Sequence, residues 1–209
     1  MLVSIEGNIG SGKSTIINYL KSLQGDKIVF VDEPVDEWTN IVVDGKNALD
    51  HFYSDIKNNS FWFQILAYIT RLRMLLETIE NNPGKIIICE RSIYTDKHVF
   101  AQMLYESGNF SEIEWTTYLY WFDTFKEKTK LDFVLYVNTH PEECFNRINK
   151  RNRTEEIGKI SLDYLTMCHR KHTDWLNNNN DINIIEINGH QSIDNIKTFV
   201  KNITETQLL

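Results

Sequence analysis

Gly7-Asn8-Ile9-Gly10-Ser11-Gly12-Lys13-Ser14 matches the phosphate-binding pattern G-x-x-x-x-G-K-[ST], which occurs between a strand and a helix. The apolar run Met1–Glu6 precedes it and a segment of helical period, Ser14–Leu23, follows, which gives the strand, loop and helix that the motif requires. Such a loop turns backbone N–H groups toward a phosphate, while the helix N-terminus and Lys13 add positive charge. Ser14 is the expected Mg²⁺ ligand. The stretch predicts ATP or GTP binding and leaves kinase, GTPase and ATPase open.

Short apolar runs rich in Val and Ile alternate with longer segments of helical period, which predicts an α/β fold. The unbroken apolar centres of the runs are typical of a parallel sheet covered by helices on both faces. No linker divides the chain, so residues 1–209 are expected to form one domain. The predicted strands are Met1–Glu6, Lys27–Asp32, Lys85–Cys89, Asp132–Val137 and Ile182–Ile187. The predicted helices are Ser14–Leu23, Ser60–Asn81, Thr95–Tyr105, Ser111–Lys128, Pro141–Lys150, Ser161–Leu176 and Ile193–Ile203.

The composition excludes several classes of protein. Of 209 residues, 42% are hydrophobic and 24% are charged, with 3 Pro and 9 Gly, which excludes collagen-like, low-complexity and largely disordered chains. The net charge of -7 provides no basic surface for nucleic acid. No apolar run approaches the roughly 18 residues of a membrane span, and the loop begins too early for a signal peptide. Three scattered cysteines form no disulfide or metal pattern, so we expect a cytoplasmic protein in a reducing compartment.

Two predicted strands end in carboxylates, at the edge where open α/β sheets bind ligands. The second strand runs into Glu33, which would face a γ-phosphate and can accept the proton of an attacking hydroxyl. The third strand runs into Glu90 and Arg91. Glu90 is placed to hold Mg²⁺, and Arg91 to bind a phosphate or the acceptor hydroxyl. The structural alternatives are an acidic loop at Glu33 and a salt-bridged strand end at Glu90 and Arg91.

Four cations, Arg147, Lys150, Arg151 and Arg153, lie within seven residues of an otherwise acidic chain. Phosphoryl transfer gives a reason for such a cluster, because arginines that close over the transferred group stabilise its charge and exclude water. A solvated helix face is the alternative explanation. We expect an arginine-rich lid over about residues 147–157.

Taken together, five ordered motifs resemble the deoxyribonucleoside kinase family over nearly the whole chain. They are Gly7–Thr15, Glu33-Pro34-Val35 with Trp38, Phe61–Gln64, Glu90–Asp96 and Arg147–Glu156. The resemblance implies the P-loop kinase fold, with a five-stranded parallel sheet flanked by helices on both faces and an arginine-rich lid. It also implies transfer of the γ-phosphate of ATP, with Mg²⁺, to the 5′-hydroxyl of a deoxyribonucleoside for nucleotide salvage.

The same resemblance implies roles for the residues on the donor side. Glu33 is the general base, Arg91 lies beside the 5′-hydroxyl, and Lys13 completes the catalytic set. Ser14 and Glu90 serve Mg²⁺. The implied ATP-binding residues are Gly7, Asn8, Ile9, Gly10, Ser11, Gly12, Lys13, Ser14, Thr15, Arg147, Arg151 and Arg153.

On the acceptor side, the resemblance implies a sugar site and a ring site. Tyr53 and Glu156 would bind the sugar 3′-hydroxyl, and Gln64 would pair with the base edge through its amide. Aromatic side chains would enclose the base by stacking. The implied acceptor-binding residues are Glu33, Trp38, Tyr53, Phe63, Gln64, Arg71, Arg91, Asp96, Phe100 and Glu156.

Arg71 and Asp96 bear on which base is accepted. Family members that take deoxycytidine or purine deoxynucleosides carry an Arg and an Asp at these places, whereas thymidine-preferring members carry smaller or apolar residues. The pair narrows the space beside a thymine methyl and offers polar partners to an amino-bearing base. We therefore expect deoxycytidine, deoxyadenosine or deoxyguanosine to be preferred over thymidine.

The resemblance also implies partners and leaves two rival functions. Relatives dimerise through helices in the region of the aromatic stretch Trp115–Phe125, so a homodimer is expected, with plain core packing as the alternative. Feedback by an end-product deoxynucleoside triphosphate is implied as well. A nucleoside monophosphate kinase of the thymidylate kinase type is the first rival, but Glu33 would stand where its acceptor phosphate sits. A non-catalytic nucleotide-binding member is the second, and it would be expected to lose Lys13 or Glu33.

Overall fold

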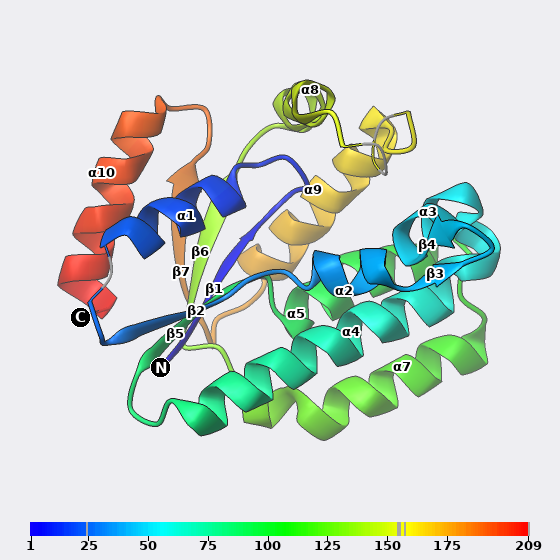
Figure 1. Cartoon of the computed structure of the whole chain (residues 1–209), viewed down its shortest axis with the longest axis horizontal. Coiled ribbons are helices and arrows are strands. Elements are labelled where there is room, and N and C mark those ends of the chain that lie inside the picture. Colours follow the sequence, from blue (N-terminus) through cyan, green and yellow to red (C-terminus); the bar gives the residue numbers. More distant parts are fainter. Residues whose placement is uncertain (24, 154–155, 157, 209) are drawn as a thin grey trace.

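The computed structural model of the chain describes residues 1–23, 25–153, 156 and 158–208. Its centre is a five-stranded parallel sheet with strand order β2-β5-β1-β6-β7 (Figure 1). The strands are β1 (Leu2–Gly7), β2 (Ile28–Val31), β5 (Ile86–Glu90), β6 (Phe133–Asn138) and β7 (Asn183–Asn188). The predicted α/β class and parallel sheet are confirmed, and each strand end lies one residue from its predicted position.

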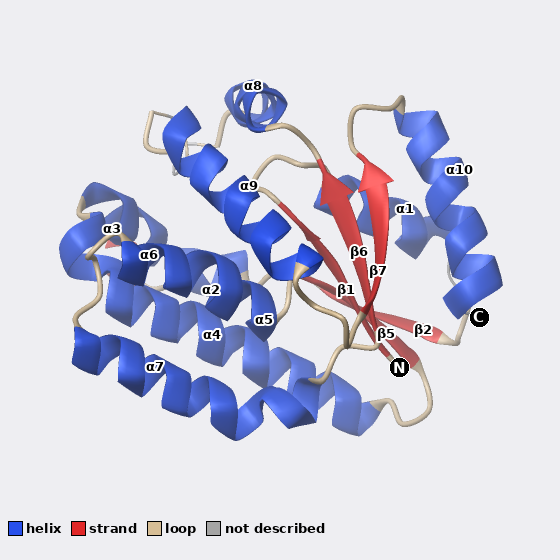
Figure 2. Ribbon diagram, turned by 180° about the vertical axis from the view of Figure 1, so that it is seen from behind, coloured by secondary structure: helices blue, strands red, loops and turns tan. Residues whose placement is uncertain are grey.

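Helices cover both faces of the sheet (Figure 2). One face packs against α1 and α10, and the other against α4, α5 and α9, with α7 lying outside α4. The α-helices are α1 (Lys13–Leu23), α2 (Val35–Asn40), α3 (Ala48–Ser54), α4 (Ile56–Asn81), α5 (Ile93–Thr95), α6 (Gln102–Glu106), α7 (Glu112–Phe125), α8 (Pro141–Arg151), α9 (Leu162–Asn177) and α10 (Ile193–Ile203). The described residues also form three helices of other types: η1 (Asp96–Ala101) and η3 (Thr204–Leu208) are π-helices, and η2 (Lys126–Thr129) is a 3₁₀-helix.

Alternation along β1 divides the core into two clusters. Val3 and Ile5 pack with α1 and α10, whereas Leu2 packs on the opposite face with α4. This alternation places Ser4 and Glu6, both fully buried, on the same face as Leu2. The sheet therefore has an apolar core on both sides, with one buried carboxylate embedded beside the helices α4 and α5.

Several elements differ from the sequence prediction. Helix α4 begins at Ile56 instead of Ser60, because the Asp55 side chain caps it by accepting the Asn58 N–H at 3.2 Å. Residues 32–60 also contain elements that no periodicity indicated: α2, α3 and the hairpin β3 (Val42–Val43) and β4 (Lys46–Asn47). The predicted helix Thr95–Tyr105 is interrupted by η1, where the helix widens over six residues.

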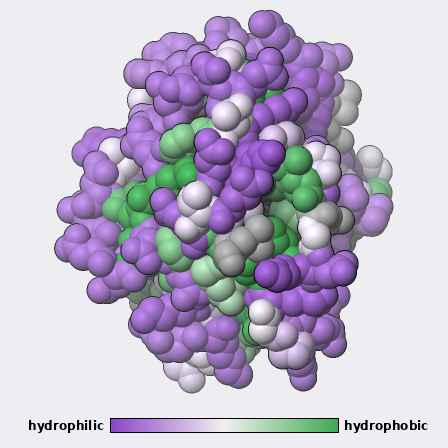
Figure 3. All heavy atoms as spheres, turned by 90° about the vertical axis from the view of Figure 1, so that its left-hand side faces the viewer, coloured by the Kyte–Doolittle hydropathy of each residue, from purple (hydrophilic) through white to green (hydrophobic). Residues whose placement is uncertain are grey.

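Within the described residues, none of the helices has the length and apolar content needed to cross a membrane. Figure 3 views the end of the molecule that carries α10, where hydrophilic atoms predominate and hydrophobic atoms gather toward the middle.

Candidate functional site

A cavity of about 760 Å³ opens at the carboxyl ends of β1, β2 and β5. Its size is in the range of small-molecule sites. The walls come from the phosphate-binding loop, the segment after β2, α2, α3, α4, η1 and the segment from α8 to α9. Of the residues that the sequence singled out, it is lined by Ile9, Gly10, Gly12, Lys13, Ser14, Thr15, Glu33, Trp38, Tyr53, Phe63, Gln64, Arg71, Glu90, Arg91, Asp96, Phe100, Arg147, Arg151, Arg153 and Glu156.

The phosphate-binding loop packs tightly against α8. Gly10 has a φ of +80°, and a Cβ at this position would lie 2.6 Å from the Cys144 carbonyl oxygen. The Lys13 ammonium donates to the carbonyls of Asn8 at 2.8 Å and Gly7 at 3.2 Å, so the lysine lies across the loop. Burial and the nearby Arg91 charge lower the pKa of Lys13 to about 8, although the carboxylates of the site act in the opposite direction.

Three predicted ATP-binding residues, Gly7, Asn8 and Ser11, lie behind the cavity wall. The Asn8 side-chain amide donates to the Leu165 carbonyl at 2.8 Å, which ties the loop to α9. The Ser11 carbonyl accepts from the Thr139 hydroxyl at 3.1 Å and from Arg147 at 3.0 Å. These side chains and carbonyls hold the loop in place, and the binding of phosphate by its backbone amides stays a prediction.

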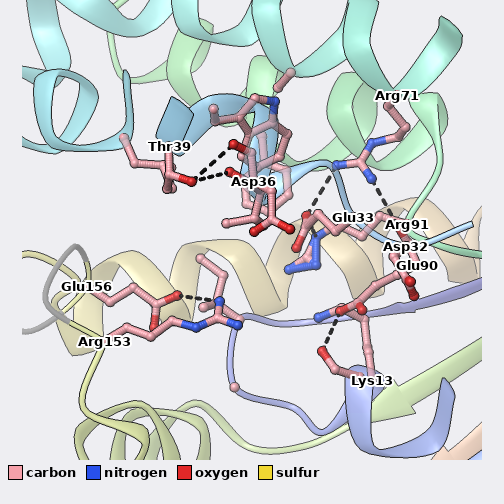
Figure 4. Close-up of a pocket in the computed structure, with 18 of the residues that line it drawn as sticks. Lys13, Asp32, Glu33, Asp36, Thr39, Arg71, Glu90, Arg91, Arg153 and Glu156 are labelled. Atoms are coloured by element: carbon pink, nitrogen blue, oxygen red, sulfur yellow. Dashed lines mark hydrogen bonds and ion pairs between the residues drawn. The ribbon is translucent and has the colours of Figure 1, made fainter. Parts of the chain in front are cut away.

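Glu33 lies between two arginines at the end of β2 (Figure 4). One carboxylate oxygen accepts from Arg71 at 3.2 Å and lies 3.6 Å from the Arg91 Nε. Burial opposes ionisation of Glu33, but the positive charges of Arg91, Arg71 and Lys13 outweigh it and lower its pKa to about 2. Glu33 is therefore a fixed carboxylate that faces Lys13 across the cavity.

The end of β5 supplies the second carboxylate. Glu90 accepts from the Ser14 hydroxyl at 2.9 Å, which joins the strand end to the start of α1. The next residue, Arg91, has a φ of +63°, a left-handed conformation that is unfavourable for a residue with a side chain. Its guanidinium is buried beside the Phe100 ring, and its Nε and Nη1 groups have no hydrogen-bond partner among the described residues. Unpartnered buried donors facing a cavity indicate that a ligand completes the site.

Arg71, on α4, contacts acidic residues from three different parts of the cavity wall. Its side chain donates to Asp96 at 2.9 Å, to the Glu90 carbonyl at 2.9 Å and to Glu33 at 3.2 Å. Both Arg71 and Asp96 are almost fully buried. Burial raises the pKa of Asp96, even though Arg71 acts in the opposite direction. The sequence-predicted pair is therefore a real contact, and it also contacts the residue expected to be the general base.

Aromatic side chains and one amide line a further part of the cavity. The Trp38 and Phe63 rings meet edge to face at 5.6 Å, and the Trp38 indole donates to Thr70 at 3.0 Å. The Gln64 carbonyl oxygen is buried without a partner among the described residues. With Phe100 on another wall, these groups provide flat apolar surfaces and a free amide edge, which suits a planar heterocycle.

Tyr53 lines another side of the cavity, together with Arg153 and Glu156 from the described residues after α8. Burial and the nearby Glu156 charge raise the pKa of Tyr53 well above its usual range. The Glu156 carboxylate forms an ion pair with the Arg151 guanidinium, and its Oε1 lies 3.5 Å from the Arg153 Nη1. Residues 154–155 and 157 of the predicted lid lie outside the described residues. Arg147, at the base of this segment, donates to the Gly189 carbonyl at 2.9 Å as well as to the loop.

Sequence reasoning missed several residues of the cavity wall. They are Asn18, Lys21, Asp32, Val35, Asp36, Thr39, Leu49, Phe52 and Tyr164. Most lie on α2 and α3, the short helices that were not predicted, and Tyr164 lies on α9. Position in the sequence was the available signal, since Asp32 and Phe52 directly adjoin Glu33 and Tyr53, which had been predicted as site residues.

The oxygen groups of Ser14 and Glu90 fit a magnesium site. A hydroxyl and a carboxylate within hydrogen-bond distance offer the hard oxygen ligands that Mg²⁺ prefers, and this ion usually takes few protein ligands beside substrate phosphates. Among the described residues, no group of three or more His, Cys, Asp or Glu side chains is arranged to hold a metal.

Comparison with known proteins gave concordant matches. A family model described as deoxynucleoside kinase matches residues 3–207. A probable deoxycytidine kinase of fowlpox virus (strain NVSL) is 37% identical over 194 residues, covering 90% of this chain and 78% of that protein. Human deoxycytidine kinase is 38% identical over 195 residues, with coverages of 83% and 74%. The mitochondrial deoxyguanosine kinase of Xenopus laevis is 33% identical over 193 residues, with coverages of 83% and 72%.

Proposed function

Because the chain belongs to the deoxynucleoside kinase family, it phosphorylates deoxynucleosides with ATP, and we propose which atoms react and which base is preferred. The acceptor is the 5′-hydroxyl of deoxycytidine or of a purine deoxynucleoside. The single observation that carries this proposal is the contact of Arg71 with Asp96 on one side and with Glu33 on the other. It supports the proposal because one buried guanidinium joins Asp96, the proposed base-reading residue, to Glu33, the proposed proton acceptor.

Glu33 is proposed to accept the hydroxyl proton. The bond from the 5′-oxygen to the γ-phosphorus forms while the bond from that phosphorus to the β–γ bridging oxygen breaks, and ADP leaves. The proton of the hydroxyl passes to a Glu33 carboxylate oxygen. A carboxylate with a pKa of about 2 is a weak base, so the proton moves late, after the forming P–O bond has made the hydroxyl acidic.

The cations around the cavity are proposed to neutralise the charge of the phosphates. Lys13 is close to the loop carbonyls and mobile enough to reach the β- and γ-phosphates. Arg91 offers two unpartnered N–H groups beside Glu33, and Arg151 and Arg153 approach from the lid segment. Ser14 and Glu90 would hold Mg²⁺, which neutralises phosphate charge and orients the transferred group.

Base preference is proposed to follow from Gln64, Arg71 and Asp96. The buried Asp96 carboxylate accepts hydrogen bonds, so it suits the exocyclic amino group of cytosine or adenine, and Gln64 offers its free amide to the rest of the edge. A thymine would bring a carbonyl and a methyl group toward this carboxylate. The relatives named deoxycytidine kinase and deoxyguanosine kinase support the same preference.

The test is an assay of ADP release with ATP, Mg²⁺ and each of the four deoxynucleosides in turn, with thymidine monophosphate as a fifth acceptor. Turnover with deoxycytidine or a purine deoxynucleoside, and little with thymidine, is the expected result. Preference for thymidine would overturn the role given to Arg71 and Asp96 and leave the kinase intact. Turnover with the monophosphate alone would favour the monophosphate kinase that Glu33 argues against.

The remaining expectations belong to the same proposal. Residues 1–209 act as one cytoplasmic kinase domain, the protein is a homodimer, and an end-product deoxynucleoside triphosphate inhibits it by occupying the donor and acceptor sites together. The cavity supports the last point, because one continuous space joins the phosphate-binding loop to the aromatic pocket.

A further inference from the structure

A carboxylate that does not line the cavity accepts hydrogen bonds from residues that closely follow Glu90 and Arg91. Glu6 lies on β1, one residue before the phosphate-binding loop, and its side chain is fully buried. Its carboxylate accepts three hydroxyl hydrogen bonds: from Ser4, from Ser92 at 2.9 Å and from Thr95. Burying a carboxylate in a sheet core is unfavourable unless its oxygens are satisfied, and here three donors satisfy them. An apolar residue would serve the core equally well, so the carboxylate needs another explanation.

The two hydroxyls from beyond β5 belong to one capping box. The Ser92 hydroxyl accepts the Thr95 N–H at 3.4 Å, and the Thr95 hydroxyl accepts the Ser92 N–H at 3.4 Å. A hydroxyl has one proton to donate, and both protons go to Glu6. Glu6 therefore orients both hydroxyls so that their lone pairs face the backbone N–H groups of the turn.

Arg91 is the residue that this capping box has to hold in place. Its left-handed φ of +63° is unfavourable for a residue with a side chain, so surrounding contacts have to maintain it. Two contacts from β1 do so on either side: the Arg91 N–H donates to the Ile5 carbonyl at 3.1 Å, and Glu6 holds Ser92, the next residue. Adjacent residues of one strand thus fix the turn from which the Glu90 and Arg91 side chains enter the cavity.

We propose that Glu6 is a positioning residue of the kinase, which acts through Ser92 and Thr95 to hold Glu90 and Arg91 in their reactive geometry. The inference rests on the roles proposed above for those two residues. It also gives the strand that leads into the phosphate-binding loop a second task. Strand β1 ends in the phosphate-binding loop, and its residue Glu6 holds the turn after β5 in place. The same strand therefore positions both the loop for the phosphate donor and the turn beside the acceptor hydroxyl.

The first test replaces Glu6→Gln, whose amide keeps the shape but can accept through one oxygen only. We expect kcat to fall by about 10–100-fold, the scale of a reacting group displaced by about 1 Å, while KM for the deoxynucleoside changes much less. Thr95→Val should reproduce the loss and Thr95→Ser, which keeps the hydroxyl, should restore it. Ser4→Ala is the matched control, because Ser4 is equally buried and donates to the same carboxylate from outside the turn.

A purely structural role predicts other results. Glu6→Gln would then lower the melting temperature and leave kcat of the folded enzyme unchanged, or Ser4→Ala would lower kcat as much as Thr95→Val; either outcome overturns the proposal. Should Glu6→Gln not fold, the Thr95→Val and Thr95→Ser pair decides the question alone, with kcat lowered by the first and restored by the second as the supporting result.

A double-mutant cycle separates this inference from the proposed function. If Glu6 acts through Arg91, Glu6→Gln should add little to the loss caused by Arg91→Ala, whereas independent effects multiply. Multiplied losses overturn the positioning role and leave the role of Arg91 intact. An Arg91→Ala variant with normal kcat would instead contradict the proposed function, whatever Glu6→Gln does.

Discussion

At the scale of single residues, Glu33 is the proposed general base and is surrounded by positive charge. Three positive groups hold its pKa at about 2, against an ordinary value of 4.5. The depressed pKa means that Glu33 contributes stability above about pH 4.5, and that this contribution is lost as the pH falls toward 2. It also means that Glu33 produces no acid limb in the activity profile near neutral pH. Its part in catalysis therefore has to be tested by substitution.

Glu33→Gln is expected to lower kcat by about 10²–10⁴-fold, because the amide cannot accept the hydroxyl proton. The dissociation constant for the deoxynucleoside should change by no more than about tenfold, the effect of one neutral hydrogen bond. Steady-state kinetics and calorimetric titration measure the two quantities. Loss of binding in parallel with turnover would mean that Glu33 only binds the acceptor, and undiminished turnover would remove it from the mechanism.

Lys13 gives a prediction at alkaline pH. Its pKa is lowered from 10.5 to about 8 in the free protein, so the folded state releases this proton first and stability gains from Lys13 as the pH rises through that window. Activity behaves in the opposite way, because the neutral amine binds phosphate poorly. We expect kcat/KM for ATP, which reports the free enzyme, to decline above about pH 8. In Lys13→Arg, whose guanidinium stays charged, that limb should vanish; an unchanged limb would assign it to another group.

Two Asp residues form ion pairs with basic side chains, one buried and one exposed, so the contributions of the two pairs to the free energy of unfolding can be compared. Asp96 and Arg71 are buried with an Nε to Oδ2 distance of 2.9 Å, whereas Asp32 pairs with Lys21 at the surface. Asp96→Ala leaves a buried guanidinium short of a partner and should lower the free energy of unfolding by about 3 kcal/mol. Asp32→Ala should change it by less than about 1 kcal/mol. Denaturant unfolding measures both, and equal losses would contradict the importance of burial here.

At the scale of elements, the close approach of the phosphate-binding loop to α8 is testable with two glycines. Gly10 and Gly84 have nearly the same φ, +80° and +79°, but a Cβ at Gly10 meets the Cys144 carbonyl oxygen at 2.6 Å and a Cβ at Gly84 meets nothing within 4 Å. Gly84→Ala should therefore cost only the left-handed backbone strain, about 1–2 kcal/mol. Gly10→Ala should cost about 1–3 kcal/mol more and raise KM for ATP. Similar unfolding curves for the two variants would show that the loop shifts to accommodate the added Cβ without loss of stability, which would contradict this prediction.

The elements that the sequence predicted well are those with long or repeated patterns. The five strands were readable because their apolar centres are unbroken, and α4 because its apolar residues recur over many turns. Helices α2 and α3 have six and seven residues, too few turns for a period to appear, and they are held by tertiary packing of Trp38 and Phe52. The residues of the π-helix η1 are of the types found in α-helices, so the sequence does not distinguish it from an α-helix; its hydrogen-bond pattern does.

For the site, motif residues were easier to predict than their connections. Residues carried by the five motifs do converge on one cavity, as for Lys13, Glu33 and Glu90. The hydrogen bonds of Asn8 to α9 and of Glu6 to the turn after β5 join residues far apart in sequence, and no local pattern contains them. Such contacts depend on strand order, which places β1 beside β5 only in the folded sheet.

At the scale of the whole molecule, charge and apolar surface are distributed unevenly. The chain carries a net charge of -7, yet seven cationic side chains line the cavity beside six carboxylates, so the cavity does not share the acidic excess of the chain as a whole. Apolar side chains remain exposed on α7, with Ile113 at 72% and Tyr120 at 75%, and on the neighbouring α4 at Trp62 and Ile69. Figures 1 and 2 place these two helices side by side at the edge of the molecule.

The homodimer proposed above predicts that a second copy of the chain covers this α4–α7 face. Tyr120→Glu and Ile113→Asp together should convert a dimer into a monomer in light scattering coupled to gel filtration, because each introduces a charge into an apolar contact. Phe199→Asp on α10, an exposed apolar residue elsewhere, is the control and should leave the dimer intact. A wild-type monomer, or a double variant that stays dimeric, would contradict this location.

The threefold contact of Arg71 has a consequence for how such an enzyme evolves. One side chain touches the expected base reader Asp96, the expected proton acceptor Glu33 and the backbone of Glu90. A lineage that changes its preferred nucleobase by mutating position 71 therefore disturbs the chemical step as well. The order of mutations then matters: a replacement of Arg71 made alone is expected to lower turnover, whereas one made after a change that holds Glu33 by other contacts is expected to alter base preference with less loss.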